Sequence, residues 1–374
     1  MFKPFLHTKY EVLLFLFLIV PFALVAQLQV EPERSNATYE IGEMATFRVT
    51  SNISGTVNYT ISFDDKSPVL SEGTIELVAG EVKTVTYQLN EPGVIICTVE
   101  MGETSVLAGA TFQPLDIQPF ISEPAGFDAF WDGAKAELAA IPIDADTSFY
   151  LVSRESRAYR MNLGNIDGRR VWGYITVPSG PGPFPGIVEF PPAGTAGYLA
   201  QQNFQLAERG NFLAVSISIH NVPPEEIDPL SYLPNDITDP NTNYYKFAVL
   251  AGIRAIDYLH TRSDFNQEDI AVTGFSQGGG IAMMVAGIDE RVDVLASSIP
   301  SHCQHGGIDA NKASGFPFYL QSIPPNERAA AREATGFYDN NNFVKRFDGP
   351  SWVCLLYTSP SPRDATLSRM PSSA

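Results

Sequence analysis

Short runs of alternating apolar and polar residues fill the chain from residue 27 to residue 112. Gly, Asn, Asp and Pro separate these runs, and no helical period competes with them. A period of two residues is typical of half-buried β-strands, so we expect a small immunoglobulin-like β-sandwich here. The clearest runs cover residues 45–50, 57–63, 74–78 and 94–100. Few aromatic residues occur among them, which favours spacing or interdomain packing over glycan binding as the role of this part.

The pattern changes after residue 112. A Pro-containing linker leads into residues 127–138, where apolar residues recur at helical spacing, and we interpret 113–145 as linker and leading helix. Beyond it, strand-like and helical patterns alternate. Such alternation predicts an α/β domain over residues 146–353, with a mainly parallel sheet covered by helices on both faces. The predicted strands cover residues 171–177, 186–190, 212–219 and 294–299, and the clearest helix covers 245–259.

One strand-to-helix junction has the residues of a catalytic turn. A β-branched run from Asp269 breaks at Gly274-Phe-Ser-Gln-Gly278 and continues as an apolar helix pattern. Glycines two positions before and after a serine permit the sharp nucleophile elbow of α/β-hydrolases. This turn would expose the Ser276 hydroxyl as nucleophile and aim the Gln277 amide, at a helix N-terminus, at a developing oxyanion. The structural alternative is a Gly-rich loop without a catalytic role.

Composition and charge exclude some partners. The chain has 374 residues, of which 44% are hydrophobic and 18% charged, as in an ordinary globular protein long enough for two domains. Its net charge of -18 would repel nucleic acid and anionic membranes, so we expect neither as a partner. The three cysteines, Cys97, Cys303 and Cys354, have neither disulfide-framework nor metal-ligand spacing. No motif indicates a metal, a nucleotide or a flavin, and we expect no cofactor.

Residues 1–26 have the pattern of a secretory signal peptide. Lys3 and Lys9 precede an apolar run over residues 12–20, and small residues end at Ala26. The apolar run is shorter than the roughly 18 to 20 residues that span a bilayer, which favours a removable signal over a membrane anchor. We therefore expect a secreted or periplasmic protein of bacterial type, without stable membrane insertion after cleavage.

The second part of the chain resembles the acetyl xylan esterase and cephalosporin C deacetylase family of carbohydrate esterases. The resemblance covers residues 122–353 and rests on the aromatic residues of the leading helix, the Tyr244-Tyr245 pair and the Gly-Phe-Ser-Gln-Gly-Gly turn. It implies an α/β-hydrolase three-layer sandwich that removes acetyl groups from short acetylated sugars. It also implies a Ser-His-Asp triad and an acyl-enzyme mechanism.

The resemblance further implies a second oxyanion donor in the loop Phe190-Pro-Pro-Ala-Gly194. Ala193 stands where the family usually has a tyrosine, so only its backbone amide is carried over. After Ser218-Ile-His-Asn the chain lacks the Arg-Gly-Gln turn common in the family. This departure indicates a divergent branch whose substrate need not be xylan, and it leaves a homo-oligomer open.

The partners of Ser276 in a triad are not evident in the sequence. In this fold an acid and then a histidine follow the nucleophile. His302 and His305 do follow it, but no strand carrying an acid separates them from Ser276. We expect these two histidines to line the pocket or to lie on a polar loop, and we expect the triad Asp and His to be absent from this chain.

The last residues offer an explanation for the missing partners. In the family, the catalytic aspartate follows a strand that this chain begins at Ser351-Trp-Val. Residues 354–374 then lose all periodicity, are rich in Ser and Pro, and resemble translated sequencing-adapter sequence, so we exclude them from the fold as non-native. Asp364 within them has no strand to present it. We therefore expect a hydrolase incomplete at its C-terminal strands, with little or no activity as written.

The leading hypothesis is a secreted serine esterase that hydrolyses acetyl esters on carbohydrates. A peptidase or a dienelactone-type hydrolase would also use the elbow, but the leading helix and the Tyr-Tyr pair favour the esterase. A non-catalytic, carbohydrate-associated scaffold is the alternative from another class. A histidine turn downstream in the natural gene would favour an enzyme.

Overall fold

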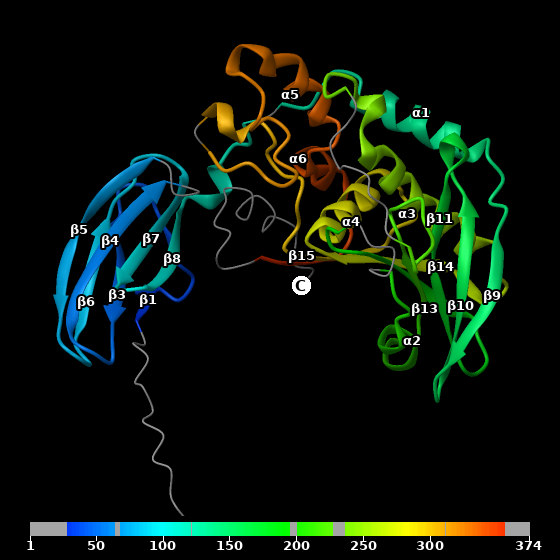
Figure 1. Cartoon of the computed structure of the whole chain (residues 1–374), viewed down its shortest axis with the longest axis horizontal. Helices are drawn as coiled ribbons and strands as arrows, with labels where there is room; N and C mark the ends of the chain where they lie inside the picture. The colour runs from blue at the N-terminus through cyan, green and yellow to red at the C-terminus, as the bar shows by residue number, and fades with distance from the viewer. Residues whose placement is uncertain are drawn as a thin grey trace, which may run out of the picture.

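The computed structural model describes residues 28–63, 68–120, 122–194, 200–226, 236–310 and 312–355. Within them the chain forms an all-β part, blue to cyan in Figure 1, and an α/β part, green to red. The predicted signal peptide and residues 356–374 lie outside the described residues. The domain boundaries, the signal and the non-native tail therefore stay predictions.

The all-β part is a sandwich of two sheets. A three-stranded sheet in the order β1-β3-β6 packs on a five-stranded sheet in the order β2-β8-β7-β4-β5. Inward side chains of both sheets, such as Phe47, Ile61 and Ile95, are fully buried in one core. The predicted small β-sandwich is confirmed. Its strands are β1 (Gln29–Pro32), β2 (Thr38–Tyr39), β3 (Ala45–Thr50), β4 (Gly55–Phe63), β5 (Val69–Leu77), β6 (Val82–Tyr87), β7 (Gly93–Met101) and β8 (Thr104–Phe112).

The α/β part is built on one sheet with the strand order β16-β15-β14-β12-β13-β11-β10-β9. Neighbours from β13 to β16 pair in parallel, whereas β9, β10 and β11 form antiparallel pairs at the other edge. The strands are β9 (Asp146–Val152), β10 (Ser156–Gly164), β11 (Arg170–Pro178), β12 (Phe184–Phe190), β13 (Leu213–Ile217), β14 (Phe265–Phe275), β15 (Val294–Ser298) and β16 (Ser351–Cys354).

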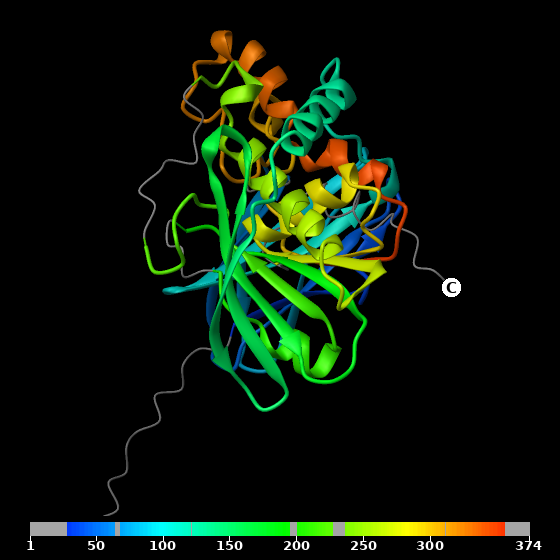
Figure 2. The same cartoon turned by 90° about the vertical axis from the view of Figure 1, so that its right-hand side faces the viewer.

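Helices cover this sheet on both faces, as expected of a three-layer α/β-hydrolase fold. α2 (Phe204–Gly210) packs on one face, while α3 (Tyr244–His260) and α4 (Gln277–Ile288) pack on the other (Figures 1 and 2). α1 (Phe127–Ala139) lies over α3 on the outside. The smaller helices α5 (Arg328–Gly336) and α6 (Asn340–Phe343) lie close to the α4 side (Figure 1).

Apolar segments fill the centre of the α/β part. Every residue of β13 is buried, which is typical of a parallel strand covered on both faces. α3 is buried around most of its circumference, including the charged Arg254, whose guanidinium donates to the carbonyl of Leu138 at 2.7 Å. The central elements are therefore rigidly packed below the carboxyl edge of the sheet. No helix within the described residues is both long and apolar enough to span a membrane.

Candidate active site

Ser276 lies in the sharp turn between β14 and α4. Its backbone has φ 56° and ψ -116°, a conformation that residues other than glycine rarely adopt. Two hydrogen bonds hold the turn: the Ser276 amide donates to the Ser298 carbonyl at 2.8 Å, and the Gly280 amide donates to the Ser276 carbonyl at 3.1 Å. The strained turn is thus fixed by the next strand on one side and by α4 on the other.

The glycines of the motif are required by close backbone contacts. A Cβ atom on Gly274 would lie 2.3 Å from the carbonyl carbon of Gly278, so strand and helix could not approach as they do. A Cβ atom on Gly278 would lie 2.2 Å from the carbonyl oxygen of Phe190 at the end of β12. The second contact brings the loop after β12 against the start of α4.

The loop after β12 carries Ala193 to the same edge of the sheet. Phe190 pairs with Gly274 in the parallel β12–β14 ladder, so both strands end side by side. Gln277 is fully buried at the first position of α4, and its side chain donates from Nε2 to the Pro192 carbonyl at 3.5 Å. Ala193 itself is exposed, next to the half-buried Ser276 turn. The structure therefore brings Ser276, Gln277 and the Ala193 loop together.

His302 and His305 lie on the loop after β15, which contacts the turn where the Ser301 amide donates to the Ser276 carbonyl at 3.1 Å. Both are buried, and the His302 ring centroid lies 3.9 Å from that of Tyr245. His302 Nδ1 is 2.5 Å from the Ser301 hydroxyl, while its Nε2 is buried without a partner. Burial, reinforced by the nearby His305, holds the pKa of His302 well below its usual value, so the ring is neutral.

The Ser276 hydroxyl makes no capping hydrogen bond to α4, and none of the described histidines is hydrogen-bonded to it. His302 bonds Ser301 instead, and the His305 amide donates to the Asp339 carboxylate at 2.7 Å. His260 lies at the opposite end of α3 from the turn. Within the described residues, Ser276 therefore has no general base in place.

His220 is a residue whose place sequence reasoning missed. It precedes the elbow in the chain, whereas in this fold the base follows the nucleophile. In the structure its Nε2 donates to the Gly194 carbonyl at 2.6 Å, and its Nδ1 is 2.5 Å from the Tyr244 hydroxyl. The sequence signal that could have identified His220 is its place directly before the point where the family's Arg-Gly-Gln turn is lacking.

A hollow of about 560 Å³ lies beside the turn, on the face of the sheet that α2 covers. Gly274 and Phe275 border it on one side and the segment 201–205 on the other. Inside it, the Glu189 carboxylate accepts hydrogen bonds from the Ser216 hydroxyl at 3.0 Å and from the Asn203 amide at 3.1 Å. The space next to the turn is therefore open and lined by both polar and apolar residues.

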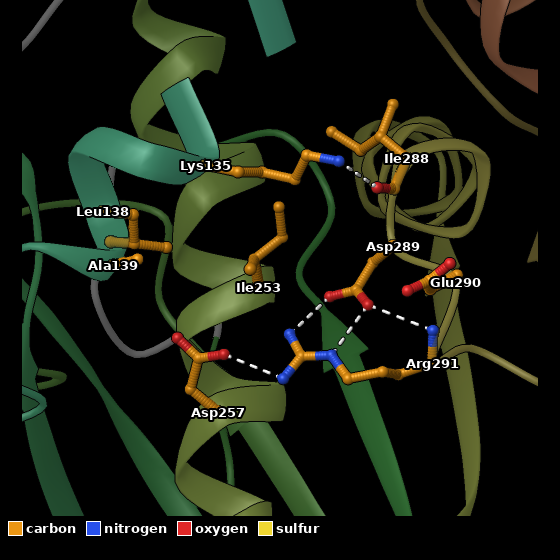
Figure 3. Close-up of a pocket in the computed structure, with 9 residues that line it drawn as sticks. All are labelled: Lys135, Leu138, Ala139, Ile253, Asp257, Ile288, Asp289, Glu290 and Arg291. Atoms are coloured by element: carbon orange, nitrogen blue, oxygen red, sulfur yellow. Dashed lines mark hydrogen bonds and ion pairs between the residues drawn. The ribbon is translucent and has the colours of Figure 1, made fainter. Parts of the chain in front are cut away.

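A second hollow, of about 370 Å³, lies at the far end of α4 (Figure 3). Its arginine is paired with two carboxylates: Arg291 bonds Asp289 at 2.7 Å and Asp257 at 2.9 Å, and Lys135 donates to the Ile288 carbonyl at 3.1 Å. The 12 residues of α4 separate it from Ser276 by roughly 18 Å. This hollow is thus held mainly by ion pairs and lies away from the Ser276 turn. The described residues hold no His, Cys, Asp and Glu cluster that could bind a metal ion.

Comparisons with known proteins agree with this architecture. The acetyl esterase Axe7A of Xylanibacter ruminicola is 24% identical over 347 residues, which cover 87% of this chain and 78% of that protein. The acetyl xylan esterase structure from a Paenibacillus species superposes with a TM-score of 0.60 at 22% identity, covering 70% of this chain and 89% of that one. Acetyl xylan esterase 1 from a Thermoanaerobacterium species gives a TM-score of 0.59 at 17% identity, covering 68% and 86%. These two structures show the shared α/β-hydrolase fold.

The family model for acetyl xylan esterases, AXE1, matches residues 116–352, more than half of the chain. The match spans the leading helix, the strained serine turn, strands β9 to β15 and the first two residues of β16. The chain belongs to the acetyl xylan esterase family.

Proposed function

We propose that this protein is a secreted serine esterase that removes acetyl groups from carbohydrates, with Ser276 as the nucleophile. Family membership supports a carboxylic ester hydrolase of the carbohydrate acetyl esterase kind. The observation that carries the residue assignment is the strained backbone of Ser276, held at the carboxyl edge of the sheet between two close-packed glycines. Strain of this kind is stored where function requires it.

The chemistry follows from the groups at this edge. The Ser276 oxygen attacks the acetyl carbonyl carbon and loses its proton to a base, and the ester oxygen leaves with the sugar as an alcohol. The backbone amides of Gln277 and Ala193 donate to the oxyanion formed on the way. Water then attacks the acetyl-serine, which releases acetate and restores the hydroxyl. No metal or other cofactor takes part in this proposal.

The substrate class is a small acetylated oligosaccharide. The residues that border the hollow beside the turn include Gln201, Gln202 and Gln205. Amides both donate and accept, and they therefore suit the hydroxyl groups of a sugar. Secretion is proposed from the charged and apolar pattern of residues 1–26, and the net charge of -18 makes nucleic acid an unsuitable partner.

The base and acid of the triad are proposed to lie outside the described residues. His302 is buried, neutral and bonded to Ser301, and His220 is engaged by Gly194 and Tyr244. Without a base at Ser276, the oxyanion donors alone would support weak residual hydrolysis. We accordingly propose that the printed chain is inactive or nearly so, and that the complete reading frame encodes the active enzyme.

The test is acetate release from an acetylated xylo-oligosaccharide by the product of the complete reading frame, beside the printed chain. Ser276→Ala should lower kcat by at least about 10⁴-fold, because nucleophile and triad act as one unit. Ser179→Ala, at an exposed strand end, is the matched control and should keep full activity. An active Ser276→Ala variant would refute the nucleophile. No release by the complete product would refute the esterase and favour the scaffold.

A further inference from the structure

Two consecutive tyrosines at the start of α3 are connected to the Ala193 loop, each through one other side chain. Tyr244 and Tyr245 are both buried, and their ring planes stand at 80° to each other with centroids 5.9 Å apart. Consecutive residues of a helix point about 100° apart, so one helix end can send two hydroxyls in different directions. Each hydroxyl bonds a second side chain, and each of these second side chains bonds the loop.

The first connection runs through Gln277. The Tyr245 hydroxyl donates to Gln277 Oε1 at 2.8 Å, which leaves the Nε2 group of the same amide free to face the loop. Nε2 donates to the Pro192 carbonyl at 3.5 Å. Since Gln277 is fully buried, this amide has a fixed orientation. The Pro192 carbonyl, immediately before Ala193, is thus held by the side chain of Gln277. The backbone amide of Gln277 is also the proposed first oxyanion donor.

The second connection runs through His220. The Tyr244 hydroxyl lies 2.5 Å from His220 Nδ1 and 2.8 Å from the Ile219 carbonyl. His220 Nε2 donates to the Gly194 carbonyl at 2.6 Å. The imidazole is 2% exposed, so it is held by its surroundings as well as by these bonds. The carbonyl of Gly194, the residue after Ala193, is thus held too.

The helix end that carries both tyrosines is itself fixed. Asn243 caps α3 by accepting from the Tyr245 amide at 3.0 Å, and the Tyr319 hydroxyl donates to the same Asn243 oxygen at 3.2 Å. The loop has few backbone donors of its own to fix it, because Pro191 and Pro192 lack amide hydrogens, and Ala193 is exposed. Gln277 and His220, which the two tyrosines of α3 bond, therefore supply contacts to the loop that its own backbone lacks at these prolines.

We propose that Tyr244 and Tyr245 are positioning residues that hold the Ala193 amide toward the oxyanion, by fixing the carbonyls on either side of Ala193 through His220 and Gln277. We call these four residues the loop clamp. The inference rests on the proposed function, in which the Ala193 amide donates to the oxyanion. A displacement of about 1 Å at such a donor can cost about 10²-fold in rate, so a clamp on both sides has a catalytic consequence.

The experiment compares Tyr244→Phe, Tyr245→Phe and the double variant in the product of the complete reading frame. Each single change should lower kcat for acetate release about tenfold and the double change about a hundredfold, with KM within about twofold, because only a transition-state contact is lost. Tyr258→Phe is the matched control: it removes a hydroxyl that accepts from the Arg262 guanidinium at 3.0 Å, at the opposite end of α3. It should leave kcat unchanged.

A conservative pair separates donation from packing at His220. His220→Gln keeps a donor for the Gly194 carbonyl and should retain most of kcat, whereas His220→Leu should lose about tenfold. If both variants lose the same amount, the histidine acts by packing alone and the clamp is refuted on that side.

Hydrogen exchange of the Ala193 and Gly194 amides gives a readout that needs no activity. It should speed up at least about tenfold in the double variant and not in Tyr258→Phe, because releasing the loop lowers its local stability. Unchanged exchange would overturn the clamp. Faster exchange with unchanged kcat would overturn its role in positioning. If the enzyme with Ser276 intact hydrolyses no acetyl ester, the proposed function fails, while exchange still decides whether the clamp exists.

Discussion

His302 should make the protein lose stability in mild acid. Its ring is fully buried against Tyr245, and burial together with His305 holds its pKa well below the usual 6.5. The unfolded chain binds a proton at this side chain below about pH 6.5, while the folded protein does not. The free energy of unfolding therefore falls as the pH falls through 6.5, and it is unaffected above that value.

The magnitude follows from proton linkage. If the folded ring stays neutral down to pH 5, the loss between pH 7.5 and pH 5 is RT ln(1 + 10^(6.5 - pH)), or about 2 kcal/mol. His302→Asn removes the titrating ring and keeps a residue that tolerates the positive φ of 60°. The substitution has its own cost from the lost ring, about 1–3 kcal/mol, which is the same at every pH.

Urea unfolding between pH 5 and pH 7.5 measures this effect. The wild-type protein should lose about 2 kcal/mol more over this range than His302→Asn does, so the two stability curves converge toward acid. Gly133→Ala in α1 is the control, since it changes no titratable group and its Cβ would meet nothing within 4 Å, and its curve should stay parallel to that of the wild type. Parallel curves for His302→Asn would show that the folded protein protonates the ring, and would refute the argument from burial.

Two further changes test the turn and the linker. Gly278→Ala should lower kcat at least about tenfold and destabilise the fold by about 1–3 kcal/mol, because its Cβ would lie 2.2 Å from the Phe190 carbonyl oxygen. Gly133→Ala in α1 is the control, since its Cβ would meet nothing within 4 Å. It should keep activity and raise the free energy of unfolding in urea by up to about 1 kcal/mol. Equal effects of the two changes would contradict the close packing at the turn. The Arg346 guanidinium lowers the pKa of the Glu123 carboxyl to about 2. Glu123→Gln should therefore lower the free energy of unfolding in urea at pH 7 by about 1 kcal/mol after solvent screening, and the difference should vanish as the pH falls from 4.5 toward 2. A difference that persists at pH 2 would show that Glu123 acts by packing.

The sequence predicted the elements whose pattern is dictated by burial. β13 and α3 are apolar enough to be placed within one or two residues of their observed ends, and the glycine spacing placed the turn at Ser276. β9 and β10 were not predicted, because β9 lies at the edge of the sheet and exposes apolar residues such as Phe149 and Val152, so its alternation carries little information.

The network around the turn could not be predicted in the same way. Tyr245 and Gln277 are 32 positions apart, and His220 and Gly194 are 26 apart. Such pairs meet only because β12, β13 and β14 are neighbours in the sheet, an order that local periodicity does not contain. The burial of His302 likewise depends on the path of the loop after β15, which has no regular period to indicate where its side chains point.

The central claim is that an acetyl group passes through Ser276. The most direct measurement is rapid acid quench of the product of the complete reading frame during turnover of an acetylated xylo-oligosaccharide, followed by peptide mass spectrometry. We expect the mass of one acetyl group on the peptide that contains Ser276, and none in Ser276→Ala. Acetate release by the unmodified protein without this adduct, or continued release by Ser276→Ala, would contradict the account.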